Sequence, residues 1–484
     1  MELNDKYEIV VGLEVHAQLM TQTKAFSGDP YTYGTSPNTQ VSPQNLAHPG
    51  TLPKPNFKSL ELALKMGIAC HCDIHERTHF ARKNYFYADL PKGYQITQFT
   101  SPICTGGYVT IKDEEGNEKR ITLDKIIMEE DSGKSIHDLD PFASLIDLNR
   151  AGVPLIEIVS NPDIRLPEEA GQYLTEIRQM VRYLDICDGN MEEGSLRCDA
   201  NVSVRLRGTS VLNTRCEIKN LNSIRNVQRA IAAEAKRQME LIETGGRVTN
   251  DTRGFDAVKG ETYPMRSKEL ANDYRYFPEP DIPPILVTQN EIKAIEAKMP
   301  ELPKALMARL IKDYGLSEYD AAVITSEKEY ALYYQGILEH THHYKAAANW
   351  LNGPIRSWLN ENAIELDNIP ISTTQIAELI KLTEENKISF STASQKVFAE
   401  LVSKAYTGSV ELLVKEMNLL QVDDDNMIHR LIQETLEQYP DKVAEYRGGK
   451  KGVLGLFMGE IMKKSQGKAD PKKANNLLLE ALAR

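Results

Sequence analysis

An acidic stretch followed by Gly-Lys-Ser holds residue types that could manage a phosphate group. Residues 125–137 read KIIMEEDSGKSIH, in which Glu129, Glu130 and Asp131 precede Gly133. A phosphate-binding loop needs another glycine five positions earlier, so that backbone N–H groups wrap the phosphates, but methionine stands there. Acids repel a bare phosphate and instead hold a hard cation that a phosphate can join. The stretch therefore predicts a metal site rather than a P-loop.

Alternating strands are predicted to position these acids. In VGLEVHAQL, at 11–19, the odd positions are apolar, and the even positions hold one glycine and then polar residues. LRCDANVSVRL, at 196–206, and RCEIKN, at 215–220, alternate in the same way. The three polar faces carry Glu14 and His16, then Arg197, Asp199 and Asn201, then Glu217 and Lys219. Such strands predict an antiparallel sheet with one face on the core and the other free to form a cleft.

The predicted cleft would collect many carboxylates. It gathers Glu14, Glu129, Glu130, Glu192, Glu193, Asp199 and Glu217 around His16. So many acids cannot all stay ionised without a counter-charge, and a divalent cation is the simplest one. Oxygen ligands with one imidazole favour Mg²⁺ or Mn²⁺ over zinc. Lys134, Arg197 and Lys219 could then bind the phosphate oxygens that the metal leaves free.

Two stretches mix cations with aromatic rings, and one mixes cysteine with histidine. ARKNYFYADLPKGYQITQ, at 81–98, and DYRYFPEPD, at 273–281, suit stacking on a base or a terminal adenosine, and equally suit plain packing. CHCDIHERTH, at 70–79, invites a zinc interpretation, but C-x-C is tighter than the usual C-x2-C knuckle and no second cysteine pair follows. We expect no metal there.

The composition is that of a globular protein without a membrane span. Hydrophobic residues are 41% and charged residues 26% of 484 residues, and no apolar run is long enough to cross a bilayer. Six cysteines in so long a chain predict reduced thiols. The start, MELNDKYEIVVG, is acidic and reaches a strand at once, so we expect no secretory signal and a cytoplasmic location. The net charge of −12 excludes a surface that is basic overall, although residues 447–484 hold nine Lys/Arg and three Asp/Glu.

The pattern along the chain predicts an α+β protein of three domains. Strands and turns fill residues 1–292, and four prolines in FPEPDIPPILV mark the end of that part. Amphipathic helices follow over 293–408, and a small helical module carries the basic residues over 409–484. Its last helix is predicted to have Asp470 as cap and Pro471 in first position. The first part should be a mainly antiparallel sheet with a long helix capped by Asn222 or Ser223.

These stretches together resemble a known family. The following motifs are similar, in order, to those of the B subunit of aspartyl/glutamyl-tRNA amidotransferase: GLEVHAQL, HPGTLP, RKNYFYADLPKGYQITQ, MEEDSGKSIH, DLNRAGVPLIEIVS, MEEGSLRCDANVSVR, EIKNLNSI and DYRYFPEPD. The resemblance covers nearly the whole chain. It implies a catalytic cradle domain at 1–292, a helical domain at 293–408 and a YqeY-like tail that binds tRNA at 409–484.

The resemblance also implies a reaction and its partners. Misacylated Glu-tRNA(Gln), Asp-tRNA(Asn) or both would be converted to Gln-tRNA(Gln) and Asn-tRNA(Asn). ATP and Mg²⁺ would turn the side-chain carboxylate into an acyl phosphate, which ammonia then displaces. The chain lacks the motifs of a glutaminase nucleophile, so ammonia would come from an amidase A subunit through a protected channel, in a heterotrimer with a small C subunit.

Site roles follow from the alternation and the resemblance together. The predicted catalytic residues are Glu14, His16, Glu129, Glu130, Arg197 and Lys134. The predicted metal ligands are Glu14, His16, Glu130, Glu193 and Asp199. The nucleotide or the aminoacyl end is assigned to Arg82, Lys83, Tyr85, Lys92 and Lys219. The predicted tRNA-binding residues are Lys450, Lys451, Lys463, Lys464 and Lys468.

One loop departs from the family pattern. Many members carry two cysteine pairs before PG-x-LP that form a zinc knuckle, whereas FSGDPYTYGTSPNTQVSPQNLAHPG has Ser27, Ser42 and Asn45 there and no cysteine. We expect no structural zinc, and we expect this loop to hold by packing alone.

Two alternatives stay open at this point. A tRNA-binding scaffold would use the basic tail and the aromatic stretches, but not an acid-lined sheet face, because acids repel RNA. A metal-dependent kinase or ligase for a small carboxylic acid would use the acids and leave the tail idle.

Overall fold

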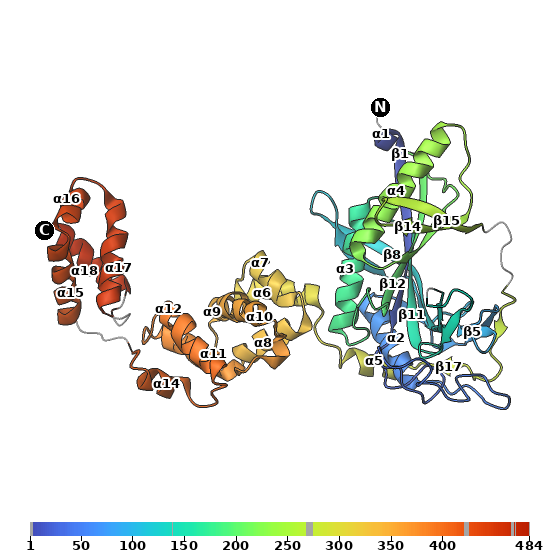
Figure 1. The fold of residues 1–484 in the computed structure, drawn as a ribbon, viewed down its shortest axis with the longest axis horizontal. Coiled ribbons are helices and arrows are strands. Elements are labelled where there is room, and N and C mark those ends of the chain that lie inside the picture. Colours follow the sequence, from blue (N-terminus) through green and yellow to red (C-terminus); the bar gives the residue numbers. More distant parts are fainter. Residues whose placement is uncertain are drawn as a thin grey trace. The chain divides into compact units, whose positions relative to one another are not determined.

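The computed structural model describes most of the chain (Figure 1). It covers residues 3–137, 139–267, 274–420, 425–465, 469 and 471–483. As predicted, strands dominate the first part and helices the second. Asp470 and Lys468, predicted as a cap and a tRNA-binding residue, lie outside the described residues.

A ten-stranded sheet forms the frame of the first part. Its order is β15-β14-β13-β12-β1-β11-β8-β6-β2, with β7 on a further stretch of β8. Their bounds are β1 Tyr7–Gln18, β2 Asp73–Ile74, β6 Cys104–Thr105, β7 Tyr108–Lys112, β8 Glu118–Glu130, β11 Pro154–Ser160, β12 Leu196–Leu206, β13 Cys216–Leu221, β14 Asp251–Asp256 and β15 Glu261–Ser267. Neighbouring strands run antiparallel except for β13 and β14, which are parallel. The sheet is thus mixed, with antiparallel pairs in the majority.

Small sheets accompany it. They join β9 (Lys134–Ile136) with β10 (Leu145–Asp147), β16 (Phe277–Pro278) with β4 (Ala81–Asn84) and β5 (Tyr94–Thr97), and β17 (Ile285–Leu286) with β3 (Arg77–Thr78). The cationic segment before residue 98 and the aromatic segment after residue 273 therefore meet in one sheet, because Phe277 pairs with Arg82.

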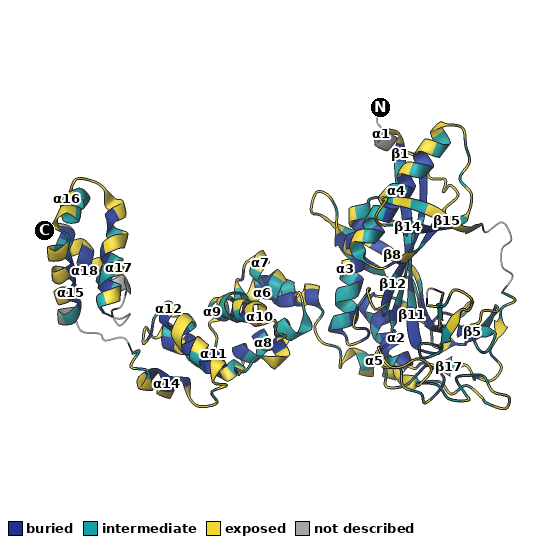
Figure 2. Ribbon diagram, in the orientation of Figure 1, coloured by how far each residue is buried: buried dark blue, intermediate teal, exposed yellow. Residues whose placement is uncertain are grey.

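One face of the large sheet is covered by helices (Figure 2). These are α2 (Phe57–Ala69), α3 (Pro167–Tyr183) and α4 (Ile224–Glu243), which contact β8, β7 and β12 respectively. The apolar positions of β1, namely Val11, Leu13, Val15 and Ala17, are fully buried in the same core as these helices. The alternation predicted for β1 and β12 is confirmed, so their polar positions point to the opposite face.

The long helix α4 begins where its cap was predicted. The Ser223 hydroxyl accepts a hydrogen bond from the Asn226 N–H at 3.2 Å, which satisfies a free donor of the first turn. Val227, Ile231 and Ala235 are buried on its sheet-facing side.

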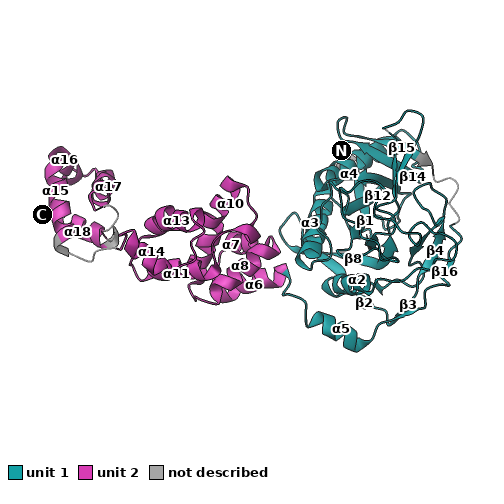
Figure 3. Cartoon of the chain, turned by 60° about the horizontal axis from the view of Figure 1, so that its bottom comes forward, with its two compact units in different colours: residues 1–302 teal, residues 303–484 magenta. Residues whose placement is uncertain are grey.

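The chain divides into two compact units, Met1–Leu302 and Pro303–Arg484 (Figure 3). The first compact unit thus extends to Leu302, beyond residue 292, and the predicted domain end at 292 stays a prediction. The reason for this extension is packing: Ile292, Ile295 and Met299, in and after α5 (Gln289–Glu296), lie against the core of the first unit.

Among the described residues of the second unit, every regular element is a helix. The α-helices before residue 420 are α6 Pro303–Tyr314, α7 Glu318–Thr325, α8 Lys328–Leu338, α9 Tyr344–Trp350, α10 Arg356–Asn362, α11 Thr373–Glu384, α12 Phe390–Thr392, α13 Phe398–Ser403 and α14 Val410–Glu416. Trp350 is buried against Phe390 and Phe398, so it packs the core of these helices.

The last helices share a core of their own. They are α15 Asp425–Gln438, α16 Pro440–Arg447, α17 Leu454–Lys464 and α18 Pro471–Ala483. Phe457, Ile461, Ala474 and Leu478 are fully buried in that core. The division of the helical part between residues 408 and 409 stays a prediction.

A buried carboxylate ties α4 to the edge of the sheet. Glu234 is fully buried and accepts hydrogen bonds from Arg237 at 2.6 Å, Gln238 at 2.8 Å and Thr262 at 2.7 Å. The Arg253 guanidinium lies 3.3 Å from the same carboxylate. Since Thr262 and Arg253 come from β15 and β14, this network fixes the sheet edge on the helix.

We predict that Glu234→Ala lowers the free energy of unfolding of the first unit by about 3–5 kcal/mol, because it leaves a buried guanidinium unpaired. Both tryptophans, Trp350 and Trp358, lie in the second unit. The midpoint of urea unfolding should therefore fall when it is followed by far-ultraviolet circular dichroism. It should stay unchanged when it is followed by tryptophan fluorescence.

Glu240→Ala, an exposed change on the same helix, is the control and should stay within about 0.5 kcal/mol. A Glu234→Ala chain that unfolds at the same urea concentration as the parent would show that the network contributes nothing to stability.

Candidate active site

Strand register brings the polar positions of three strands side by side. His16 on β1 is paired with Glu157 on β11 and with Arg197 on β12. Glu14 is paired with Asp199 on β12. Directly opposed residues of an antiparallel pair share a face, with their Cβ atoms about 5 Å apart. The backbone alone therefore places these side chains together.

Two more carboxylates join this face. Glu217 on β13 is opposite Asn201 on β12, and Glu129 on β8 is opposite Leu155 on β11. The Asn201 amide donates to Glu14 Oε1 at 2.8 Å and so fixes the orientation of that carboxylate.

The ligand atoms fall into two tight groups. His16, Glu129 and Glu157 form one group, and Glu14, Asp199 and Glu217 form the other, with the ligand atoms of each group within 4.8 Å of one another. Opposite oxygens around Mg²⁺ lie about 4.2 Å apart and around Ca²⁺ up to about 5 Å apart. Each group therefore fits a hard divalent cation, with oxygen ligands in the majority and one imidazole in the first group.

One carboxyl in each group has a raised pKa. Burial raises the pKa of Glu14, and the Glu157 and Glu217 carboxylates raise it further. Burial and the Glu157 carboxylate likewise raise the pKa of Glu129, against the opposing effect of Lys83. Both carboxyls would be stabilised in the charged form by a bound cation.

The imidazole of His16 is held by its neighbour. Its Nε2 lies 3.4 Å from Glu157 Oε2. Burial alone would lower the pKa of His16, but the hydrogen bond and the charge of Glu157 outweigh it and raise the pKa.

Cationic side chains surround the two groups. Arg197 Nη2 donates to Asp131 Oδ2 at 2.7 Å, while its buried Nε has no hydrogen-bond partner within the described residues. Lys219 Nζ lies 2.7 Å from Asp199 Oδ2 and 3.0 Å from Glu217 Oε1. Lys83 Nζ lies over the Tyr274 ring, 5.2 Å from its centroid.

These side chains line a cleft of about 600 Å³. Both carboxylate groups open into it, together with Lys83, Tyr85, Arg197, Lys219 and Tyr274. The rings of Tyr85 and Tyr274 meet edge to face, with centroids 6.1 Å apart. The cleft thus combines acids, cations and aromatic rings in one space.

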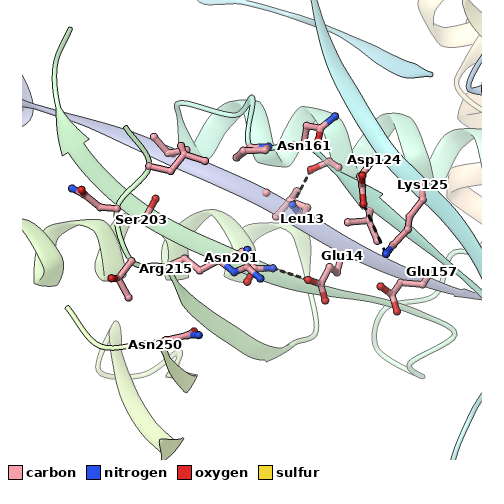
Figure 4. A pocket seen from close by; sticks show the side chains of 18 residues that line it. Leu13, Glu14, Asp124, Lys125, Glu157, Asn161, Asn201, Ser203, Arg215 and Asn250 are labelled. Carbon is pink, nitrogen blue, oxygen red and sulfur yellow. Dashed lines mark hydrogen bonds and ion pairs between the residues drawn. The ribbon is translucent and has the colours of Figure 1, made fainter. Parts of the chain in front are cut away.

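A second hollow, of about 610 Å³ (Figure 4), shares lining residues with the cleft. Glu14 and Glu157 line both hollows, so the candidate cation groups lie where the two meet. The second hollow is lined with amides and hydroxyls, including Asn201, Ser203 and Asn250.

Many of the predicted site residues do meet in the cleft. They are Glu14, His16, Lys83, Tyr85, Glu129, Arg197, Asp199 and Lys219. Their roles stay predictions, since geometry alone does not test them.

Glu130 and Lys92 lie elsewhere, contrary to the predicted placement. Consecutive residues of β8 face opposite sides of the sheet, so Glu129 and Glu130 cannot share the cleft. Glu130 is buried, where its carboxylate accepts from the Ile96 N–H at 2.9 Å and from Lys92 Nζ at 2.6 Å. The pair lines a separate hollow of about 290 Å³.

Three more predicted residues are outside the cleft. Glu193 is exposed in the turn before β12, where Glu192 lines the cleft instead. Lys134 is exposed on β9. Arg82 is engaged with Glu279 at 2.7 Å, and its guanidinium stacks over Tyr94.

The Gly-Lys-Ser segment has no P-loop geometry. Lys134 and Ser135 belong to a strand instead of the start of a helix, and the Gly133 N–H donates to the Asp89 carbonyl at 2.8 Å. A Cβ at Gly133 would lie 2.8 Å from the Asp147 carbonyl oxygen, so the glycine serves a close backbone contact.

Glu157 is the residue that sequence reasoning missed. It stands alone among apolar neighbours in PLIEIVS. A single acid at an alternating position of an otherwise apolar strand was the available signal. Its pairing with His16 depends on strand register, which the sequence does not display.

The cysteine-free loop is held by hydrogen bonds as well as packing, which corrects the expectation of packing alone. The Asp29 carboxylate accepts from Ser27 Oγ at 3.0 Å, from Ser42 Oγ at 2.8 Å and from the Ser42 N–H at 3.1 Å. The Asn45 N–H donates to Ser42 Oγ at 3.3 Å. The two serines at the knuckle positions therefore share one carboxylate, and Asn45 is joined to them through its backbone.

The cysteine and histidine cluster at 70–79 has ordinary structural contacts. His71 stacks on Tyr108 with centroids 4.8 Å apart, and His75 Nε2 lies 3.0 Å from Thr105 Oγ1. Cys70 is buried.

The basic residues of the last helices are at the surface or close to it. Lys450, Lys451 and Lys463 are exposed and Lys464 is half-buried, and Lys450 lies 3.1 Å from Glu445. Among the described helices, none combines the length and the hydropathy that a bilayer span requires.

Comparison with known proteins defines the class. The sequence profile of the GatB/GatE catalytic domain matches residues 9–293, and that of the GatB domain matches residues 332–482. The first match contains both carboxylate groups, so the cleft belongs to a GatB/GatE-type catalytic domain.

Curated relatives match along their whole length. The aspartyl/glutamyl-tRNA(Asn/Gln) amidotransferase B subunit of Caldanaerobacter subterraneus subsp. tengcongensis is 46% identical, over 99% of this chain and 100% of the relative. Proteins of the same name from Chlorobaculum tepidum and Thermodesulfovibrio yellowstonii are 48% and 45% identical, over 98% and 99% of this chain and 99% of each relative. The chain belongs to the family of aspartyl/glutamyl-tRNA(Asn/Gln) amidotransferase B subunits.

Proposed function

We propose that this chain is the activating subunit of a tRNA-dependent amidotransferase that uses ATP. The observation that supports this most is the pair of carboxylate groups, side by side on one sheet face and surrounded by Lys83, Arg197 and Lys219. A free carboxylate is a poor electrophile, and its conversion to an amide requires prior activation. A site that neutralises phosphates with metal and with cationic side chains suits that activation.

In this proposal the side-chain carboxylate of the misacylated glutamate or aspartate attacks the γ-phosphorus of ATP. The bond from the γ-phosphorus to the bridging oxygen breaks, ADP leaves, and an acyl phosphate forms. Ammonia then adds to the acyl carbon, inorganic phosphate leaves with the electron pair of the C–O bond, and a proton is lost, so the amide remains. Mg²⁺, when bound, would screen the phosphate charges.

The chain's own residues have separate tasks. His16, Glu129 and Glu157 would hold one cation, and Glu14, Asp199 and Glu217 another, with Asn201 keeping Glu14 in place. The charged Arg197 is oriented by Asp131 and would bind phosphate oxygens.

Two hollows suit two substrates. The cleft, with Tyr85 and Tyr274, would take the aminoacyl end, because rings and cations suit the terminal adenosine. The adjoining hollow, with its amides and hydroxyls, would take the nucleoside of ATP. The γ-phosphate would then lie near Glu14 and Glu157, where the hollows meet.

The partners and the location complete the proposal. The ammonia would come from an amidase A subunit in a heterotrimer with a small C subunit, and the exposed lysines near the C-terminus would contact tRNA phosphates. Work on aminoacyl-tRNA would place the complex in the cytoplasm.

The first prediction from this proposal concerns Glu157. In the reconstituted heterotrimer with ammonium chloride in place of glutamine, Glu157→Gln should reduce ATP-dependent formation of Gln-tRNA(Gln) on the order of 10²-fold or more, because a cation ligand is removed. Conversion of radiolabelled Glu-tRNA(Gln) measures it.

Glu193→Gln distinguishes the ligand set predicted from the sequence, which includes Glu193, from the set that the structure brings together. The structure puts Glu193 outside the cleft, so this variant should keep activity within about threefold. Equal losses in both variants would show that Glu193 also acts in the site, contrary to its position outside the cleft. Full activity of Glu157→Gln would refute the cation assignment.

A second prediction tests which substrate each hollow binds. Asn250 and Asn222 are both exposed, and each lines one hollow. Asn250→Trp should raise the KM for ATP about tenfold or more by filling the nucleoside hollow, and Asn222→Trp should raise the KM for aminoacyl-tRNA instead. Steady-state kinetics with each substrate varied provides the measurement, and the reverse pattern would exchange the two assignments.

The third prediction concerns the tail. Changing Lys450, Lys451, Lys463 and Lys464 to glutamate should weaken tRNA binding at least about tenfold, and it should flatten the salt dependence by about one unit of slope for each phosphate that is no longer neutralised. Filter binding at several salt concentrations tests this. Unchanged binding and activity would favour a small-molecule ligase.

A further inference from the structure

One ammonium group lies among the acids of the second carboxylate group. Lys219 Nζ is 2.7 Å from Asp199 Oδ2 and 3.0 Å from Glu217 Oε1. The third member, Glu14, is held by Asn201 at 2.8 Å instead. The lysine therefore supplies a positive charge to the same oxygens that would bind a cation.

Lysine and a divalent cation would compete for these oxygens. The ligand atoms of Glu14, Asp199 and Glu217 are within 4.8 Å of one another, so a cation bound by all three lies between them. An ammonium that keeps its positions beside Asp199 and Glu217 would then be only a few ångströms from that cation. Like charges so close in a partly buried site repel strongly.

The side chain of Lys219 has space to move. It is 32% exposed and lines the cleft of about 600 Å³ in which the phosphoryl transfer is placed. It comes from β13, whose backbone is fixed by pairing with β12 and β14. A rotation of the side chain would thus carry its charge into the cleft without a change in the sheet.

We propose that Lys219 is an exchangeable counter-ion of this cation site. Its ammonium partly balances the charges of Asp199 and Glu217 until a divalent cation binds; the cation then displaces the ammonium, which turns into the cleft and binds the transferring phosphate. This inference rests on the proposed function. It implies that the cleft gains a free positive charge only after the metal has bound, so that metal and phosphate bind in a coupled manner.

The test is the affinity of Lys219→Met for Mn²⁺. The paramagnetic resonance signal of free Mn²⁺ measures it, and the sample is the full-length chain in its heterotrimer. Linkage is reciprocal, so removal of a competing charge should tighten binding at this site about tenfold or more. The same variant should be slower in ammonium-dependent formation of Gln-tRNA(Gln). Tighter cation binding together with slower transfer is not expected of a side chain with a structural role alone.

Three variants serve as controls. Lys219→Arg keeps a charge and should bind Mn²⁺ within about threefold of the parent. Lys119 on β8 forms a comparable ion pair with Glu169 on α3, at 2.6 Å and outside the cleft, so Lys119→Met should leave the Mn²⁺ affinity unchanged. Glu217→Gln should lose the affinity altogether. Lys219→Gln takes the place of Lys219→Met if the latter does not fold.

The outcomes separate this inference from the proposed function. If the parent chain binds no Mn²⁺ that depends on Glu217, both are overturned. If it does, and Lys219→Met binds Mn²⁺ equally or more weakly, the cation site stands and the exchange is refuted. Tighter binding in Lys219→Met but not in Lys219→Arg supports the exchange.

Discussion

The concentration of carboxylates on one face of the sheet is the constraint on which the site depends. Strand pairing sets Glu14 against Asp199 and His16 against Glu157, so the acids cannot separate without breaking the sheet. Their repulsion must be balanced by nearby positive charge. The surrounding lysine and arginine side chains, and the cations that the two groups fit, are therefore linked to the stability of the sheet as well as to chemistry.

The rigidity that holds these acids comes from the other face. The apolar positions of β1 and β12 are buried beneath α3 and α4, and the Glu234 network fixes the sheet edge on α4. Large apolar burial on one side thus compensates for an unfavourable charge arrangement on the other. Acids placed on loops would move apart, whereas acids on a packed sheet keep their separations.

The sequence predicted which side chains share a face of the sheet, but not which strands lie next to one another. The alternation in VGLEVHAQL and LRCDANVSVRL correctly placed Glu14, His16, Arg197 and Asp199 on the polar side, because a period of two is a local property. The same rule, applied to Glu129 and Glu130, would have shown that only one of them can face the cleft. Sequence patterns do not show which strands adjoin or in what register, so the pairing of Glu157 with His16 could not be found.

The boundary and the loop show a similar limit. The proline-rich connector correctly indicated the end of the strand-rich part, but Ile292, Ile295 and Met299 extend the first unit, since their packing partners are distant in sequence. The role of Asp29 was also invisible in the sequence, because its partner Ser42 lies thirteen positions further along an irregular backbone. Contacts between distant residues, and not local propensities, account for the differences.

The opposite orientations of Glu129 and Glu130 have a consequence for how this strand can change over evolutionary time. One inserted residue within β8 would exchange the two sides, placing the acid of the cleft in the buried position next to Lys92 and removing the one carboxylate that β8 contributes to the cleft. Insertion of two residues would restore the phase. Length variation among relatives should therefore gather in the exposed turn at 113–117, ahead of the strand, where added residues leave the frame of β8 intact.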